Sequence, residues 1–225
     1  MSHLLDNIFW HALSGSQRHF SEGVDRARRY ATGFSPIVAF PDPQRPDFDA
    51  LAPFCRPDEH FYCDGWTGAA PKGWQIEKDA AMYKMIWDAP MPDEDAAPDA
   101  VPLRAEHAPQ AVALATLTNP GPFGIRTIEL GEYFGYFDGE RLVAMTGERS
   151  AAPGLREISG VCTHPDFQGR GLARRLGLKL IRRQMLRGET PFLHVMSHNT
   201  TAHTMYQRMG FRDHRESPVR VVSRS

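Results

Sequence analysis

The chain has 225 residues, of which 41% are hydrophobic, and its formal net charge is −1. This size and composition suit one large or two small globular domains with a sizeable core. The near-neutral charge gives no general reason to expect nucleic acid or a membrane as partner, and no apolar run reaches the length of a membrane span. Three cysteines, an odd number, argue against a disulfide framework. Without a signal-peptide pattern at the N-terminus, we expect a cytoplasmic protein.

Residues 1–90 predict a small α/β domain, because helix-like and strand-like patterns are interleaved there. The apolar spacing predicts helices over residues 4–30 with a Ser/Gly break between them, strands at 36–40 and 59–63, one or two helical turns at 47–54, and a hairpin of 74–78 with 81–87 around Asp79. Residues 91–100 are acidic, proline-rich and without apolar periodicity. They predict a linker to a second domain at 101–225.

Residues 101–225 contain clearer signals. They predict strands at 101–104, 157–163 and 191–196, helices at 109–117, 127–131, 172–187 and 199–209, and a hairpin of 133–137 with 141–146 around Asp138-Gly139. The polar tail from Asp213 is expected to fray or to add one edge strand.

The segment Gln168-Gly169-Arg170-Gly171-Leu172-Ala173 joins the strand at 157–163 to the helix at 172–187. Two glycines and an alanine keep bulky side chains away from an approaching ligand. The first N–H groups of a helix lack partners and its dipole favours negative charge, so this loop predicts an anion site. It is not a Walker loop, since no Gly-Lys-Ser/Thr follows. The third glycine of a dinucleotide-binding loop is also missing.

The Gln-x-x-Gly-x-Ala pattern of this loop resembles the pyrophosphate loop of the GNAT superfamily of acyl-CoA-dependent N-acetyltransferases. Residues 199–211 resemble that family's closing segment, Asn-x-x-Ala-x-x-x-Tyr-x-x-x-Gly-Phe. The two pieces occur in the family's order, and the resemblance covers about half of the chain, residues 101–212. It implies an α/β (α+β) fold with a mixed, mostly antiparallel sheet flanked by helices. Residues 1–90 are then a smaller domain, in some family members a degenerate GNAT-like half.

The resemblance also implies acetyl-CoA as cosubstrate. It implies that the pyrophosphate is bound by the loop residues Gln168, Gly169, Arg170, Gly171, Leu172 and Ala173, with Arg174 beyond them as a phosphate partner. The resemblance also implies that the backbone of Val161, Cys162 and Thr163, together with Asn199, binds the pantetheine arm. One N–H in that strand would polarise the thioester carbonyl. For the basic residues of the following helix, a solvated surface is the alternative interpretation.

Two residues are candidates for proton transfer. Glu157 lies eleven residues before Gln168, and the family's histone acetyltransferases carry a catalytic glutamate at a similar offset, which implies a general base. The alternative is a strand-end glutamate paired with Arg156 or Arg126. Tyr206 matches the family tyrosine that meets the CoA sulfur and protonates the leaving thiolate; the alternative is a core aromatic residue.

The remaining candidates are weaker. Cys162 as a nucleophile competes with a buried structural thiol. Cys55, His60 and Cys63 fit no common zinc spacing, so no metal is expected. Phe123 and Tyr133 are expected to line the acceptor pocket.

The resulting hypothesis is acetyl transfer from acetyl-CoA to an amine. The alternatives are a non-catalytic acyl-CoA-binding or sensing module, and an acyltransferase that uses another acyl chain or a hydroxyl acceptor. The sequence leaves the acceptor and the oligomeric state open.

Overall fold

The computed structural model describes residues 3–225, which form one sheet of eleven strands and five α-helices. The strand order is β1-β2-β3-β4-β11-β5-β10-β9-β8-β7-β6, and only the β3–β4 and β9–β10 pairs are parallel. The predicted α/β (α+β) fold with a mixed, mostly antiparallel sheet flanked by helices is therefore confirmed. No helix among residues 3–225 combines the length and the apolar character needed to cross a bilayer.

The strands are β1 (Ser21–Val24), β2 (Ala27–Tyr30), β3 (Ile37–Ala39), β4 (His60–Asp64), β5 (Trp74–Trp87), β6 (Val101–Pro102), β7 (Tyr133–Asp138), β8 (Arg141–Ala152), β9 (Leu155–Thr163), β10 (Thr190–Met196) and β11 (Phe211–Arg224). The helices are α1 (Ile8–Ser14), α2 (Phe48–Leu51), α3 (Ala108–Thr118), α4 (Leu172–Leu186) and α5 (Thr200–Met209). In the second half of the chain the predicted elements up to residue 209 are present at nearly their predicted places, except that the helix predicted at 127–131 is a 3-10 helix, Thr127–Leu130, and the strand predicted at 101–104 is shortened to β6.

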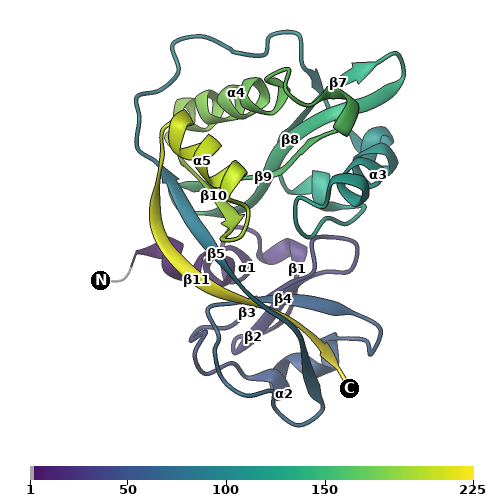
Figure 1. Ribbon diagram of the computed structural model, residues 1–225. Helices are drawn as coiled ribbons and strands as arrows, with labels where there is room; N and C mark the ends of the chain where they lie inside the picture. Colours follow the sequence, from purple (N-terminus) through teal and green to yellow (C-terminus); the bar gives the residue numbers. More distant parts are fainter. Residues whose placement is uncertain (1–2) are drawn as a thin grey trace.

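Two 14-residue strands, β5 and β11, run through the molecule from one half to the other (Figure 1). They pair along their whole length, and they also pair with β10 and β4 respectively. The predicted hairpin around Asp79 is thus wrong, because Asp79 lies within β5 opposite Arg220, whose guanidinium contacts its carboxylate at 2.9 Å. The expectation of a frayed tail or an edge strand is also wrong, because Val219 and Val222 are buried in the sheet.

The helix predicted over the later part of residues 4–30 is replaced by the β1–β2 hairpin. The apolar residues there do have helical spacing, but Gly23 has φ +131° and the chain turns at 25–26. Arg29 is buried because Glu59 binds its guanidinium through both carboxylate oxygens, at 2.6 and 2.7 Å. This long-range pair gives a charged residue an inward position that the local pattern does not predict.

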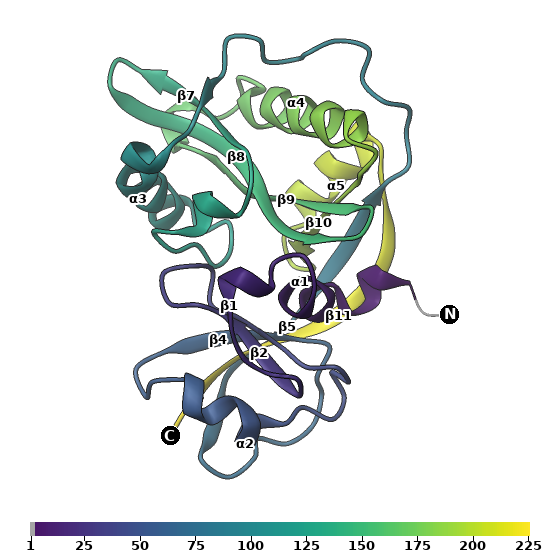
Figure 2. The same cartoon turned by 180° about the vertical axis from the view of Figure 1, so that it is seen from behind.

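Helices cover both faces of the sheet's second half (Figures 1 and 2). On one face, α4 and α5 pack through Leu176, Leu180 and Tyr206. On the other face, α3 packs over β7 to β9, while α1 packs against β8 and the first half of the chain. Since α1 contributes to a core shared with β5, β9 and β10, the two halves have no separate hydrophobic interiors at this point.

Residues 91–100 contain no helix or strand, as expected of a linker, but they lie along α4 (Figure 1). Lys179 donates to the Asp95 carboxylate at 2.5 Å and to the Ala97 carbonyl at 3.1 Å, and Ala97 is fully buried. Arg175 binds Asp99 at 2.7 Å. We call residues 91–100 the strap. The division into domains at 1–90 and 101–225 stays a prediction, and the sheet continues across it through β5.

Candidate functional site

The site begins where two neighbouring strands separate. Strands β9 and β10 pair in parallel from Leu155–Thr190 to Ile158–Leu193, and no pairing continues beyond, although both strands do. At this point β9 also contains a bulge, because two residues, Gly160 and Val161, lie opposite one residue of β8. Gly160 has φ +61°, which glycine adopts without strain. The bulge displaces the end of β9 from its regular ladder and leaves room between the strands.

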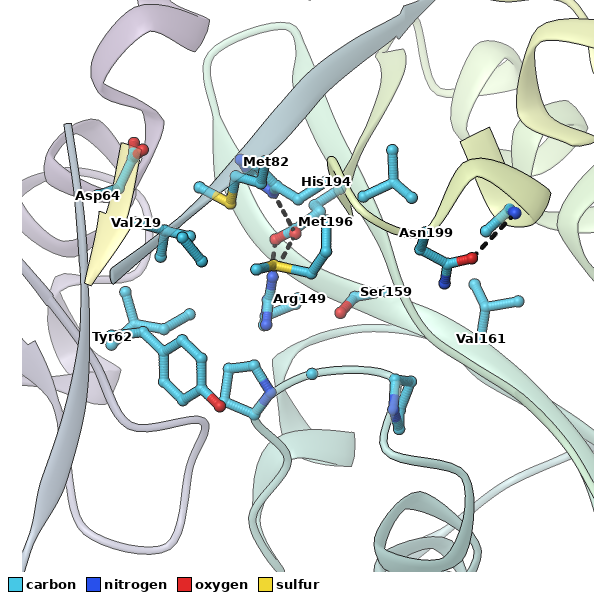
Figure 3. A pocket seen from close by; sticks show the side chains of 18 of the residues that line it. Tyr62, Asp64, Met82, Arg149, Ser159, Val161, His194, Met196, Asn199 and Val219 are labelled. Carbon is cyan, nitrogen blue, oxygen red and sulfur yellow. Dashed lines mark hydrogen bonds and ion pairs between the residues drawn. The ribbon is translucent and has the colours of Figure 1, made fainter. Parts of the chain in front are cut away.

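A cavity of about 240 Å³ occupies this opening (Figure 3). One wall comes from the second half of the chain and includes Ser159 and Val161 of β9, Met196 of β10, and Asn199 and Tyr206 at α5. The opposite wall comes mainly from the first half, with Phe9 of α1, Ile37 of β3, Tyr62 and Asp64 of β4 and Met82 of β5, and it also includes Val219 of β11. The cavity therefore lies between the two halves, which β5, β11 and the core around α1 connect.

Four of the predicted site residues line this cavity: Glu157, Val161, Asn199 and Tyr206. Asn199 caps α5, since its Oδ1 accepts the Ala202 N–H at 3.1 Å, so a ligand contact falls to its amide nitrogen. Tyr206 packs edge-on against Phe211, and burial raises the pKa of its phenol above the ordinary value. Its hydroxyl therefore keeps its proton at neutral pH.

Cys162 and Thr163 do not line the cavity. Cys162 points into the core beneath α3, where burial raises the pKa of its thiol to about 12. A thiol of this kind stays protonated and is a poor nucleophile, so the structure favours the interpretation of Cys162 as a buried structural residue.

The predicted loop lies outside the cavity lining, between β9 and α4. Gly169 and Gly171 have φ +74° and +73°, and a Cβ at either position would meet no atom within 4 Å. Gly171 is the N-cap of the 15-residue α4, and no side chain caps the helix. Leu172 and Ala173 form its first turn, so their N–H groups and the positive end of the dipole face open space.

Some polar side chains around this loop already make hydrogen bonds or ion pairs within residues 3–225, and others do not. Gln168 donates to the Thr163 carbonyl at 3.4 Å, and Arg170 donates to the Asp166 carbonyl at 3.1 Å. Arg174 is exposed on the first turn of α4. Because Arg175 is bound to Asp99 of the strap, Arg170 and Arg174 are the cations that could reach a phosphate here.

A chain of three hydrogen-bonded side chains, which the sequence did not predict, forms the floor of the cavity. Glu157 receives hydrogen bonds from Arg149 Nη2 at 2.6 Å, Arg149 Nε at 3.1 Å and the Ser150 N–H at 3.0 Å. His194 Nδ1 lies 2.7 Å from Glu157 Oε1. Arg149, Glu157 and His194 all line the cavity, and Figure 3 shows Arg149 and His194 there. The sequence offered only one signal for His194, a polar residue in an otherwise apolar strand.

The environment keeps Glu157 ionised. Burial alone raises the pKa of its carboxyl, but the charges of Arg149 and His194 and their hydrogen bonds outweigh burial and hold that pKa well below the ordinary value. The predicted alternative of a pair with Arg156 is not what the structure shows, because Arg156 binds Glu189 at 2.7 Å. Arg126 binds Glu129 at 2.8 Å.

Other predicted features lie elsewhere. Phe123 and Tyr133, expected at the acceptor pocket, pack edge-on against each other beside Gly160, and neither lines the cavity. Cys55 and Cys63 are buried in the core under α2. His60 binds Glu77 at 2.7 Å. Within residues 3–225 no three histidine, cysteine or acidic side chains are grouped as ligands for a metal ion.

Comparison with known proteins agrees with this geometry. Residues 133–221 match the family model described as FR47-like protein. A solved structure of a proposed acetyltransferase of the GNAT family from Novosphingobium aromaticivorans is 35% identical, with a TM-score of 0.91 and complete coverage of both chains. No curated protein gives a match.

More distant structures share the fold. A GCN5-related N-acetyltransferase-like protein from Streptococcus suis is 14% identical with a TM-score of 0.62, covering 97% of this chain and 92% of that chain. A GCN5-related N-acetyltransferase from Kribbella flavida is 17% identical with a TM-score of 0.60, covering 97% and 95%. On the strength of the full-length match at 35% identity, the chain belongs to the GNAT superfamily of acetyltransferases.

Proposed function

We propose that this protein is an N-acetyltransferase that moves the acetyl group of acetyl-CoA directly to the nitrogen of an amine. The observation that carries the proposal is the continuity of β9. The strand passes from the cavity floor at Glu157 through the bulge at Gly160 to Thr163, and one 3-10 turn then leads to the glycine loop at the start of α4. One strand thus links a place for a reacting acetyl group with a place for a diphosphate.

The residues of the loop fit the diphosphate of acetyl-CoA. Gly169 and Gly171 leave open space at their Cα atoms, and the first turn of α4 offers N–H groups without a capping side chain. Arg170 and Arg174 add positive charge. The pantetheine arm would follow Val161 and Asn199 into the cavity, and a backbone N–H at the displaced end of β9 would polarise the thioester carbonyl.

The reaction forms one N–C bond and breaks the C–S bond of the thioester. The amine must lose a proton and the leaving thiolate must gain one. Tyr206 suits the second task, because burial keeps its phenol protonated at neutral pH and α5 holds it in the cavity wall. Glu157 suits the first task less directly, since Arg149, Ser150 and His194 already engage both of its oxygens.

The test combines binding with turnover. Calorimetry should show binding of acetyl-CoA, and a thiol-detecting reagent should show CoA release with at least one primary amine from a panel of small amines. Binding without thiol release for any amine would favour an acyl-CoA sensor. Faster release from a longer acyl-CoA, or release with alcohols alone, would favour an acyltransferase with another acyl chain or a hydroxyl acceptor.

A further inference from the structure

We propose that His194 is the group that accepts the proton of the acceptor amine, and that Glu157 positions its ring through Nδ1. This inference rests on the proposed transfer reaction and names the acceptor-side residue of that same cavity. His194 lies on β10 immediately after the last residue that pairs with β9. It therefore occupies the point at which the two strands open.

The ring of His194 has one engaged and one unengaged nitrogen. Nδ1 lies 2.7 Å from Glu157 Oε1, whereas Nε2 is buried and has no hydrogen-bond partner among residues 3–225. The ring stacks on Phe9, with centroids 5.0 Å apart. A buried polar atom without a partner is uncommon in proteins, and at a cavity wall it indicates a group that a ligand or a bound water satisfies.

Glu157 determines which nitrogen is basic. Its carboxylate is ionised and accepts hydrogen bonds, so the neutral ring places its proton on Nδ1 and leaves the lone pair on Nε2. Arg149 and the Ser150 N–H fix the carboxylate from the other side. Glu157 is thus a positioning residue, and a proton released by the amine goes to Nε2 of His194.

Among the described residues, the cavity has no unpaired acidic side chain that could bind an ammonium group. The cavity-lining residues include two acids, and both are paired: Glu157 with Arg149, and Asp64 with Lys84 at 2.6 Å and with Ser217 Oγ at 2.6 Å. Apart from Asp64, the wall from the first half contains the charged residue Lys78 and is otherwise mainly apolar. We therefore expect an amine on a compact apolar body, bound in its neutral form after the proton has passed to His194.

We expect Nε2 to become accessible through side-chain movement. Met196 follows His194 by two residues on the same face of β10, and Met82 lies opposite Met196 on β5. Both methionines line the cavity, as Figure 3 shows. Methionine is unbranched and repacks readily, so the acceptor or one water can reach the ring without a change in the backbone.

Several charged groups surround His194. Its ring contacts the Glu157 carboxylate of β9, which is paired with Arg149 of β8. Lys84 lies directly opposite on β5, and Lys78 of the same strand lines the cavity. Asp64 of β4 offsets Lys84. The Tyr30 hydroxyl of β2 lies 3.4 Å from Ser150 Oγ and donates to Gln17 Oε1 at 2.7 Å, and the contact from α1 is the uncharged ring of Phe9.

The first experiment needs no acceptor. In protein labelled with ¹⁵N-histidine, long-range ¹H–¹⁵N spectra from pH 6 to 9 distinguish the ring tautomers, and His194→Gln identifies the His194 signals by their disappearance. We expect a neutral ring protonated on Nδ1 at the upper end of this range. A ring protonated on Nε2, or one that stays doubly protonated to pH 9, would overturn the proposal whether or not the protein acetylates amines.

The second experiment measures thiol release against pH, with phenethylamine, which is charged at neutral pH, and aniline, which is neutral there. His194→Gln should lower kcat by about 10²–10⁴-fold with phenethylamine and much less with aniline, since a general base contributes on that scale. Glu157→Asp, which keeps the charge but shortens the reach, should retain part of the rate and shift the pH profile. Acetyl-CoA affinity should stay unchanged in both variants.

A matched control is available on α5. His203 Nε2 lies 2.7 Å from Asp213 Oδ1, the same distance as in the His194 pair, but His203 does not line the cavity. His203→Gln should leave the rate and the pH profile unchanged. If His194→Gln behaves like this control, His194 is not the proton acceptor. If the wild-type protein releases no thiol with any amine, the transferase proposal fails, and the tautomer measurement alone decides the state of His194.

Discussion

The two ends of the proposed active region are built in different ways. The proposed cofactor end consists of exposed backbone, with Gly169 and Gly171 in the left-handed region and a helix start that no side chain caps. The proposed acceptor end consists of buried polar side chains from separate strands, the ion pair of Arg149 and Glu157 with the ring of His194. A diphosphate can be bound by a short continuous segment, whereas a desolvated proton-transfer group needs partners brought together by the whole sheet.

This difference determines what a mutation does. A change in the loop removes ligand contacts and leaves the core intact. A change in the buried charges also affects folding, because a lone charge left in a protein interior is costly. Each prediction below tests one side of this comparison.

The largest effect is expected from Gly171→Val. A β-branched side chain at φ +73° would fill the space in front of the α4 N-terminus and remove at least two charge-assisted hydrogen bonds to phosphate, each worth about 2 kcal/mol. Acetyl-CoA affinity should fall about 10³-fold or more, as measured by calorimetry.

Gly188→Val is the matched control for this loss. Gly188 follows α4 at φ +74°, and a Cβ there also meets no atom within 4 Å. Both variants carry a similar backbone strain of about 1–3 kcal/mol, which thermal unfolding would detect. Equal affinities for acetyl-CoA in the two folded variants would remove the loop from the cofactor site.

On the acceptor side, Arg149→Met should destabilise the fold by about 3–5 kcal/mol, because it leaves the buried Glu157 carboxylate without its main partner. Urea unfolding at pH 7 measures this loss. A loss below about 1 kcal/mol would show that the buried Glu157 carboxylate is sufficiently stabilised without Arg149, for example by His194. That result would contradict the role that the hydrogen bonds give to Arg149.

The same variant has a defined pH dependence. The native pKa of Glu157 lies below its unfolded value, so the pair contributes stability that is complete above the unfolded value of about 4.3 and is lost as the pH falls further. The stability difference between wild type and Arg149→Met should therefore be constant from about pH 6 to 7 and shrink toward pH 3. A difference that grows in acid would contradict an ionised Glu157.

Tyr206→Phe tests the junction between the two ends. The ring stays and only the hydroxyl goes, so thiol release should fall about 10²-fold across pH 6–9 with little change in acetyl-CoA affinity. Tyr133→Phe is the control, because the Tyr133 hydroxyl is buried without a hydrogen-bond partner in the described part of the chain and does not line the cavity. Similar rates in the two variants would argue against Tyr206 as the acid.

The same difference explains what the sequence could predict. The loop around Gly171 and the segment from Asn199 to Phe211 are local patterns, and together they indicated the fold, the family and four residues of the cavity. Elements of the second half appeared where their periodicity placed them. Arg149 and His194 belong to no local pattern, because their roles arise from the register of β8, β9 and β10.

The errors in the first half have the same origin. Asp79 suggested a turn, yet its partner Arg220 lies at the far end of the chain. The segment before Tyr30 has helical spacing, yet the pair of Arg29 with Glu59 and the neighbouring β3 stabilise a hairpin. In each case a contact between distant residues outweighed a local preference.

The smallest effect is expected in the strap. Asp95 pairs with Lys179 at 2.5 Å. Burial raises the pKa of this carboxyl, but the hydrogen bonds from Lys179 and the Ala97 N–H and the nearby positive charges together hold that pKa below its ordinary value. The side chain of Asp95 is 42% exposed, so solvent and salt screen the pair, and Asp95→Asn should cost about 1 kcal/mol or less.

Asp93→Asn is the control, because Arg182 contacts only the Asp93 carbonyl. Urea unfolding at low and high salt should show a small, salt-sensitive loss for Asp95→Asn alone, with acetyl-CoA affinity unchanged. A loss as large as that of Arg149→Met would mean that the strap, and not only β5 and β11, holds the two halves together.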